Sequence, residues 1–93
     1  MKIIWTETAE KNNRLNLTYL LENFGKKSVQ RFISKTKNTI SVIESNPKAR
    51  SWDKEFGFYK ILIVKQIYLF YRIEEDKIYL LNFWNNSQKP YWN

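Results

Sequence analysis

Residues 58–84 read FYKILIVKQIYLFYRIEEDKIYLLNFW, and this stretch decides the fold. It contains three runs rich in β-branched and aromatic residues, Phe58–Val64, Ile67–Ile73 and Ile78–Trp84, and such runs are typical of strands. A two-residue KQ connection joins the first pair, and the polar segment EEDK joins the second. Because parallel strands need crossovers of a dozen residues or more, these short connections predict an antiparallel meander.

The residues before this stretch predict a short strand, Lys2–Trp5, followed by two helices. Thr6 can cap the first helix, and Gly25 can end it in the left-handed conformation. The second helix ends at Asn46, because a residue that precedes proline avoids helical geometry. Apolar side chains recur at helical spacing in both helices: Leu17, Leu20, Leu21 and Phe24 in the first, and Val29, Phe32, Ile33, Thr36, Ile40 and Ile43 in the second.

The order of elements is therefore β-α-α-β-β-β, which predicts a single α+β domain over residues 1–93. Residues 48–57 are expected to form a polar, basic loop between the second helix and the meander. The short join at Gly25 makes the two helices an antiparallel hairpin. We expect this hairpin to pack on one face of a small antiparallel sheet.

Composition removes several classes of chemistry. The chain has no cysteine and no histidine, which excludes a thiol nucleophile, a serine triad and the commonest metal ligands. We therefore expect no metal and no cofactor. The formal net charge of +7 favours a polyanionic partner such as nucleic acid, a ribosome or an acidic protein. Without a signal peptide or a membrane span in the sequence, we expect a cytoplasmic protein with no membrane partner.

Tight turns predict which residues share a face of the meander. They place Lys60 opposite Tyr71, and Tyr71 opposite Leu80. The face assigned to the helices carries Tyr59, Ile61, Ile63, Tyr68, Phe70, Arg72, Tyr79, Leu81 and Phe83. The other face, expected to be partly open, carries Phe58, Lys60, Leu62, Leu69, Tyr71, Leu80, Asn82 and Trp84.

On this open face Lys60 and Tyr71 are the candidate catalytic residues. A cation can stabilise the phosphorane formed when a 2′-hydroxyl attacks its own phosphate, and a tyrosine or lysine can move the protons. The same side chains also suit plain binding of phosphate or of an acidic protein surface. Further candidates for binding RNA or another target are Arg50, Lys54, Asn82, Lys89 and Tyr91.

Taken in order, these segments resemble the RelE/ParE superfamily of toxins over essentially the whole chain. The resemblance rests on a first strand that ends in Trp5, on the helix corner LLENFG at 20–25 and on IESNPKAR at 43–50. It continues through the three meander strands and ends with NNSQKP at 85–90. It implies a bacterial type II toxin that is neutralised by a cognate antitoxin, in a toxin–antitoxin hetero-oligomer. The antitoxin would cover the apolar residues of the open face, Leu62, Leu69, Leu80 and Trp84.

The superfamily has two branches, and the residues bear on the choice between them. One branch cleaves mRNA on the ribosome with arginines and a C-terminal tyrosine or histidine, and the other inhibits DNA gyrase. Here Lys60 and Ser87 stand where the resemblance leads one to expect arginine, and lysine lacks the bidentate fork of arginine. Lys54, Lys89 and Tyr91 are the possible substitutes. The incomplete set favours gyrase inhibition; the alternatives are a ribosome-dependent mRNA endoribonuclease and a basic interaction module without toxicity.

Overall fold

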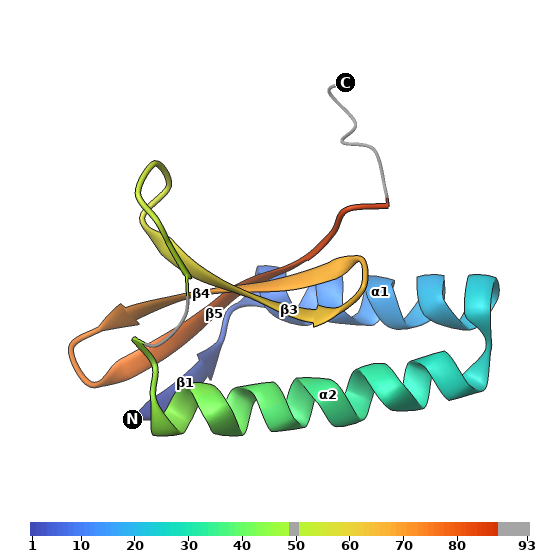
Figure 1. Cartoon of the computed structure of the whole chain (residues 1–93), viewed down its shortest axis with the longest axis horizontal. Helices are drawn as coiled ribbons and strands as arrows, with labels where there is room; N and C mark the ends of the chain where they lie inside the picture. Colours follow the sequence, from blue (N-terminus) through green and yellow to red (C-terminus); the bar gives the residue numbers. More distant parts are fainter. Residues whose placement is uncertain (49–50, 88–93) are drawn as a thin grey trace.

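A computed structural model describes residues 1–48 and 51–87, without the side chain of Ser51 (Figure 1). The α+β class is confirmed, and these described residues contain one strand more than expected. The elements are β1 (Lys2–Trp5), α1 (Glu7–Phe24), α2 (Lys26–Ser45), β2 (Ser51–Asp53), β3 (Phe58–Val64), β4 (Ile67–Glu74) and β5 (Lys77–Asn85).

The extra strand, β2, lies within the segment expected to be a loop. It pairs antiparallel with β3, with Trp52 opposite Tyr59, and the two rings contact edge to face at 4.7 Å between centroids. Three residues are too few to show a hydrophobic period of two. The strand is therefore created by backbone pairing at the sheet edge rather than by a pattern that the sequence displays.

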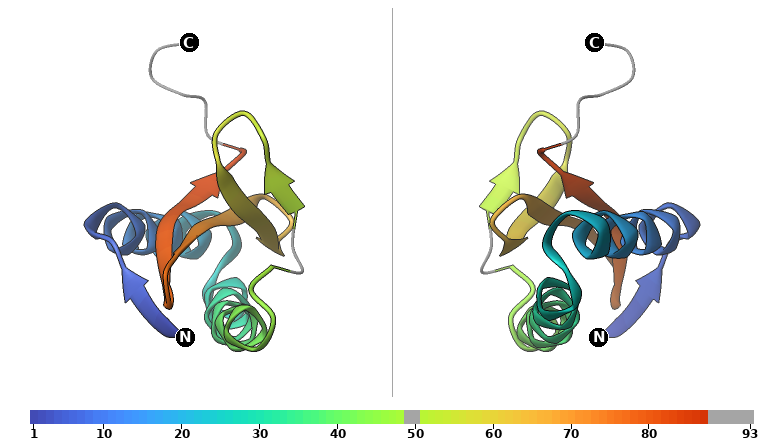
Figure 2. Two further views of the ribbon diagram at one scale, coloured as in Figure 1. Left: turned by 90° about the vertical axis from the view of Figure 1, so that its left-hand side faces the viewer. Right: turned by 90° about the vertical axis from the view of Figure 1, so that its right-hand side faces the viewer.

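The five strands form one mixed sheet in the order β1-β5-β4-β3-β2. The predicted antiparallel meander is confirmed by β3, β4 and β5, and the sheet is mixed because β1 pairs parallel to β5, with Ile3 opposite Ile78. Both helices lie on the same side of the sheet (Figures 1 and 2). No helix in residues 1–48 and 51–87 is long and apolar enough to cross a membrane.

The helix boundaries follow the predicted signals. The Thr6 hydroxyl accepts a hydrogen bond from the Ala9 backbone N–H at 3.2 Å, which caps α1. Gly25 ends α1 as expected, but the prediction of a left-handed conformation is wrong. Its φ of 89° is combined with an extended ψ of −177°, a region that is essentially restricted to glycine.

The core lies between the helices and the inner face of the sheet. The apolar side chains that recur at helical spacing were expected to face the core. This is confirmed at Leu20, Phe32 and Ile43, which are buried. The same expectation is wrong at Leu21 and Phe24, which are 50% and 57% exposed at the corner of the helical hairpin. The buried hydrophobic residues are Ala9, Leu20, Phe32, Ile43, Ile63, Ile67, Leu69, Tyr71, Ile78, Leu80 and Phe83.

Two irregularities in the sheet change the predicted faces. Near Ile63 the β3–β4 register shifts by one residue, so Tyr71 lies opposite Tyr59 rather than opposite Lys60. A second shift near Leu81 alters the β4–β5 register, although Tyr71 still pairs with Leu80 as expected. A shift of one residue exchanges the two faces of a strand. For this reason β4 presents its other set of side chains to the helices.

Candidate functional surface

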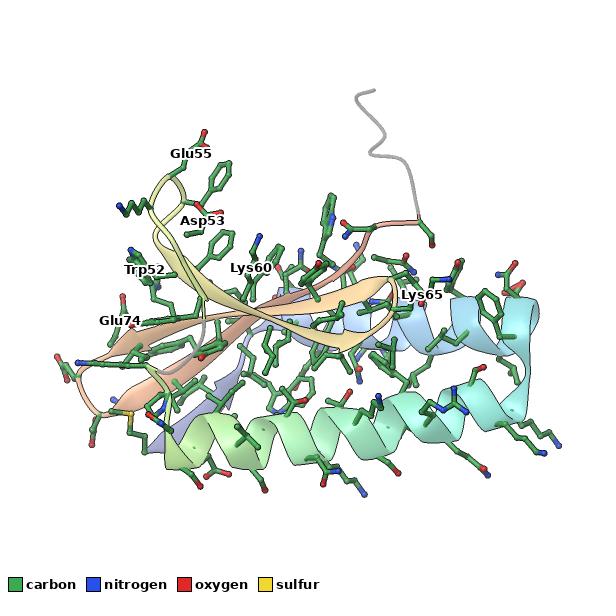
Figure 3. The ribbon with its side chains drawn as sticks, in the orientation of Figure 1. Trp52, Asp53, Glu55, Lys60, Lys65 and Glu74 are labelled. Atoms are coloured by element: carbon green, nitrogen blue, oxygen red, sulfur yellow. The ribbon has the colours of Figure 1, made fainter. Side chains whose placement is uncertain are left out.

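The sheet face away from the helices carries a row of aromatic side chains around one lysine. We call Phe58, Lys60, Leu62, Tyr68 and Phe70 the open sheet face. The Phe58 and Phe70 rings stack at 4.6 Å between centroids, and the Lys60 ammonium lies 5.8 Å from the centre of the Tyr68 ring. Lys60 is exposed and projects from this side of the sheet (Figure 3). The surface can therefore offer one cation beside flat apolar rings to a partner.

The expected pair of Lys60 and Tyr71 does not form. Tyr71 is 0% exposed, and its hydroxyl donates a hydrogen bond to the Pro47 carbonyl oxygen at 2.6 Å. Its ring stacks on Tyr59 at 5.2 Å on the helix side of the sheet. The placement of Tyr71 on the open face is wrong because of the β3–β4 register shift. Tyr68 is the phenol that lies beside Lys60 instead.

Two of the four residues expected to meet an antitoxin are also in the core. Leu69 and Leu80 are both 0% exposed, so their predicted place on the open face is wrong for the same reason as that of Tyr71. Leu62 is 48% exposed on the open sheet face. Trp84 is half-buried and pairs across the strands with Tyr68. The apolar surface on this side is therefore formed by Leu62, Trp84 and the β4 aromatics Tyr68 and Phe70 rather than by the predicted leucines of β4 and β5.

The remaining candidates are scattered. Lys54 is exposed at the turn between β2 and β3, which Asp53 holds by accepting a hydrogen bond from the Glu55 backbone N–H at 2.9 Å. Asn82 is half-buried, and its side-chain oxygen accepts a hydrogen bond from the Asn12 amide at 2.6 Å. Asn82 is thus tied to α1. Arg50, Lys89 and Tyr91 lie outside the described residues.

A buried polar network joins α1 to the end of β5, and the sequence reading missed it. The Asn16 amide, 3% exposed, donates to the Phe83 carbonyl at 3.0 Å and accepts from the Asn85 amide at 3.0 Å. Ser87 continues the network, since its Oγ lies 2.5 Å from Asn85 Oδ1 and 2.7 Å from the Tyr19 hydroxyl. One signal was available: Asn16 lies four residues before buried Leu20 and so shares its helix face.

These features define a class of protein, a small basic α+β domain with a helical hairpin on one side of a mixed sheet. Solved toxins share this fold. The chromosomal ParDE system from P. aeruginosa gives a TM-score of 0.76 at 14% identity, over 91% of this chain and 95% of that chain. The YoeB/ParE toxin from Agrobacterium tumefaciens gives 0.67 at 13% identity, over 91% and 98% of the two chains. A heterotetrameric YoeB–YefM toxin–antitoxin complex from Staphylococcus aureus gives 0.60 at 14%, over 90% and 94%.

At such identities the likeness concerns the fold alone, and the family comes from the sequence. Residues 3–90 match the model of the ParE toxin of type II toxin–antitoxin system, parDE. The chain therefore belongs to the ParE toxin family, which confirms the predicted RelE/ParE resemblance. A comparison with curated proteins gave no match. Membership makes the chain the toxin component of a type II system and implies a cognate antitoxin as its partner.

Proposed function

We propose that the chain inhibits DNA gyrase. The observation that carries the proposal is the position of Tyr71, which is buried and donates a hydrogen bond to the Pro47 carbonyl. A general base or acid must reach the proton that it transfers, and the Tyr71 hydroxyl is directed into the protein instead. Ser87, which stands where the nuclease branch is expected to have arginine, is engaged with Asn85. Family membership supports the same choice.

The test separates the two targets of the superfamily. Purified toxin is added to gyrase with relaxed plasmid and ATP and, in parallel, to a translation reaction with a defined mRNA. We expect accumulation of gyrase-cleaved or unsupercoiled plasmid and an intact mRNA. Cutting of the translated mRNA with normal gyrase activity would contradict the proposal.

A second candidate is ribosome-dependent mRNA cleavage, and the Lys60–Tyr68 pair favours it. This pair places a cation beside a phenol ring on the open sheet face, and groups of these two kinds can stabilise the phosphorane and move protons in cleavage by a 2′-hydroxyl. It predicts that Tyr68→Phe or Lys60→Ala removes mRNA cleavage while the protein stays folded. If the toxin instead inhibits gyrase through another surface, both variants should remain toxic.

The contact with the antitoxin also concerns the open sheet face. Leu62 is exposed there, and we propose that the antitoxin covers it together with Trp84. Exposed apolar groups next to charge are a common sign of a protein partner. Leu62→Asp is expected to weaken the toxin–antitoxin complex in a pull-down of the two proteins, without loss of folding.

A further inference from the structure

A groove of about 630 Å³ lies at the corner of the molecule where α1 passes into α2. Its floor and walls also include the turn between β3 and β4 and the end of β5. Lys65, at that turn, lies on this side of the molecule (Figure 3). None of the candidate residues of the open sheet face lines this groove, so it is a separate surface.

The walls of the groove are held in place by hydrogen bonds. The Asn86 backbone N–H donates to the Gln66 carbonyl at 2.7 Å, which joins the end of β5 to the β3–β4 turn. Ser87 Oγ lies 2.7 Å from the Tyr19 hydroxyl, which joins the end of β5 to α1. The buried hydrogen bond from the Asn85 amide to Asn16 supports this second contact, because Asn85 also contacts Ser87 Oγ. A partner would therefore meet a preformed site, which lowers the entropy lost on binding.

Of the residues that the structure describes, three cations and no acidic residue line the groove. Arg31 and Lys35 lie one turn apart on α2, about 6 Å between their Cβ atoms, and Lys65 extends from the sheet. Among the described residues none of the three forms an ion pair, since the one ion pair found there joins Arg72 and Glu74. Cations concentrated in a concavity raise the local potential and attract an acidic partner.

The groove also offers apolar surface. Phe24 is 57% exposed, and its ring contacts Tyr19 edge to face, 6.0 Å between centroids and at 67°. Val64 adds an aliphatic side chain to the lining. Because the two rings contact each other edge to face, they form an apolar notch rather than a flat platform for a nucleobase. This favours an apolar side chain of a protein over a base of a nucleic acid.

We propose that this groove binds an acidic segment of the cognate antitoxin, with an apolar side chain inserted beside Phe24 and carboxylates paired with Arg31, Lys35 and Lys65. The proposal rests on the assignment of the chain as a toxin with an antitoxin partner, and it deepens that assignment by naming the binding site and its chemistry. It does not depend on gyrase as the target.

The electrostatic part is tested by charge reversal. The variants are Lys65→Glu and the double variant Arg31→Glu with Lys35→Glu, and the matched control is Lys37→Glu, exposed on α2 outside the groove lining. Binding of the purified antitoxin is followed by surface plasmon resonance at low and high salt. We expect each groove variant to lower the affinity at least about tenfold, mainly through slower association, and to flatten the salt dependence. The control should stay within about twofold.

The apolar part is tested by Phe24→Ala against Leu15→Ala, since Leu15 is equally exposed on α1 but outside the groove lining. Truncation of a buried anchor acts mainly on dissociation, so Phe24→Ala should dissociate about tenfold faster and Leu15→Ala should not. Circular dichroism melts establish that every variant is folded.

Two results would overturn the proposal. The first is antitoxin binding by the groove variants that equals the binding of Lys37→Glu. The second is a set of groove variants that bind the antitoxin normally but no longer bind a single-stranded oligothymidylate. This result would make the groove a nucleic-acid site. Gyrase assays with the wild-type toxin are run separately. If the wild-type toxin does not inhibit gyrase, the result on antitoxin binding is unaffected, so the two proposals can fail independently.

Discussion

Replacement of Tyr71 by phenylalanine tests the main correction that the structure makes to the sequence reading. The variant keeps the buried ring and its stacking on Tyr59 but removes the hydroxyl that donates to the Pro47 carbonyl at 2.6 Å. If Tyr71 is a core residue, the loss appears in stability. If Tyr71 takes part in the activity, the loss appears in toxicity.

The magnitude follows from the hydrogen bond and from the group that loses its donor. One such bond contributes about 0.5–1.5 kcal/mol net, and a buried acceptor left unpaired adds a penalty. Pro47 is half-buried, so water can partly replace the donor. We expect the free energy of unfolding to fall by about 1–2 kcal/mol. For a domain of this size, that corresponds to a Tm lower by roughly 5–15 °C.

The assay pairs urea and thermal denaturation with growth inhibition at a low temperature where both proteins are folded. Tyr68→Phe is the matched control, since the Tyr68 hydroxyl makes no hydrogen bond within residues 1–48 and 51–87, and its stability should change by less than about 0.5 kcal/mol. The reasoning would be refuted if Tyr71→Phe unfolded like the wild type but no longer inhibited growth.

Three further predictions test the fold. Leu69→Ala removes a fully buried side chain and should lower the free energy of unfolding, measured in urea, by about 2–5 kcal/mol. Its control is Leu62→Ala on the open sheet face, which should change the free energy of unfolding by less than about 1 kcal/mol. Equal effects of the two substitutions would contradict the observed register. Asn16→Ala leaves the Asn85 amide without its acceptor, and we expect a loss of about 1–3 kcal/mol in the same measurement. Gly25→Ala meets no atom within 4 Å of the new Cβ, yet it forces alanine into a glycine-only conformation, so a thermal melt should show a loss of about 1–3 kcal/mol. An unchanged melt would mean that the corner adopts another backbone conformation.

The elements that the sequence predicted well are those set by local chemistry. The bounds of β3, the cap at Thr6 and the end of α2 before Pro47 agree with the structure. Each depends on a side chain or a short pattern that acts within a few residues. The family resemblance was readable for a related reason, because it depends on the order and spacing of such segments.

The functional surfaces depend on contacts between distant segments, and the sequence did not determine them. Apolar residues occupy both sides of β4, so alternation alone could not show which set faces the helices. The register shifts near Ile63 and Leu81 decided it, because a one-residue shift exchanges the faces of a strand. They moved Tyr71 into the core and brought Tyr68 beside Lys60.

The same holds for the corner of the helical hairpin. Segments distant in sequence form the corner groove, and they meet only when the α1–α2 corner, the β3–β4 turn and the end of β5 are packed together. The sequence by itself determined the strands, the helices and the family, since these follow from local patterns. The tertiary structure alone decided which side chains are available to a partner, because a strand register is set by packing over the whole sheet.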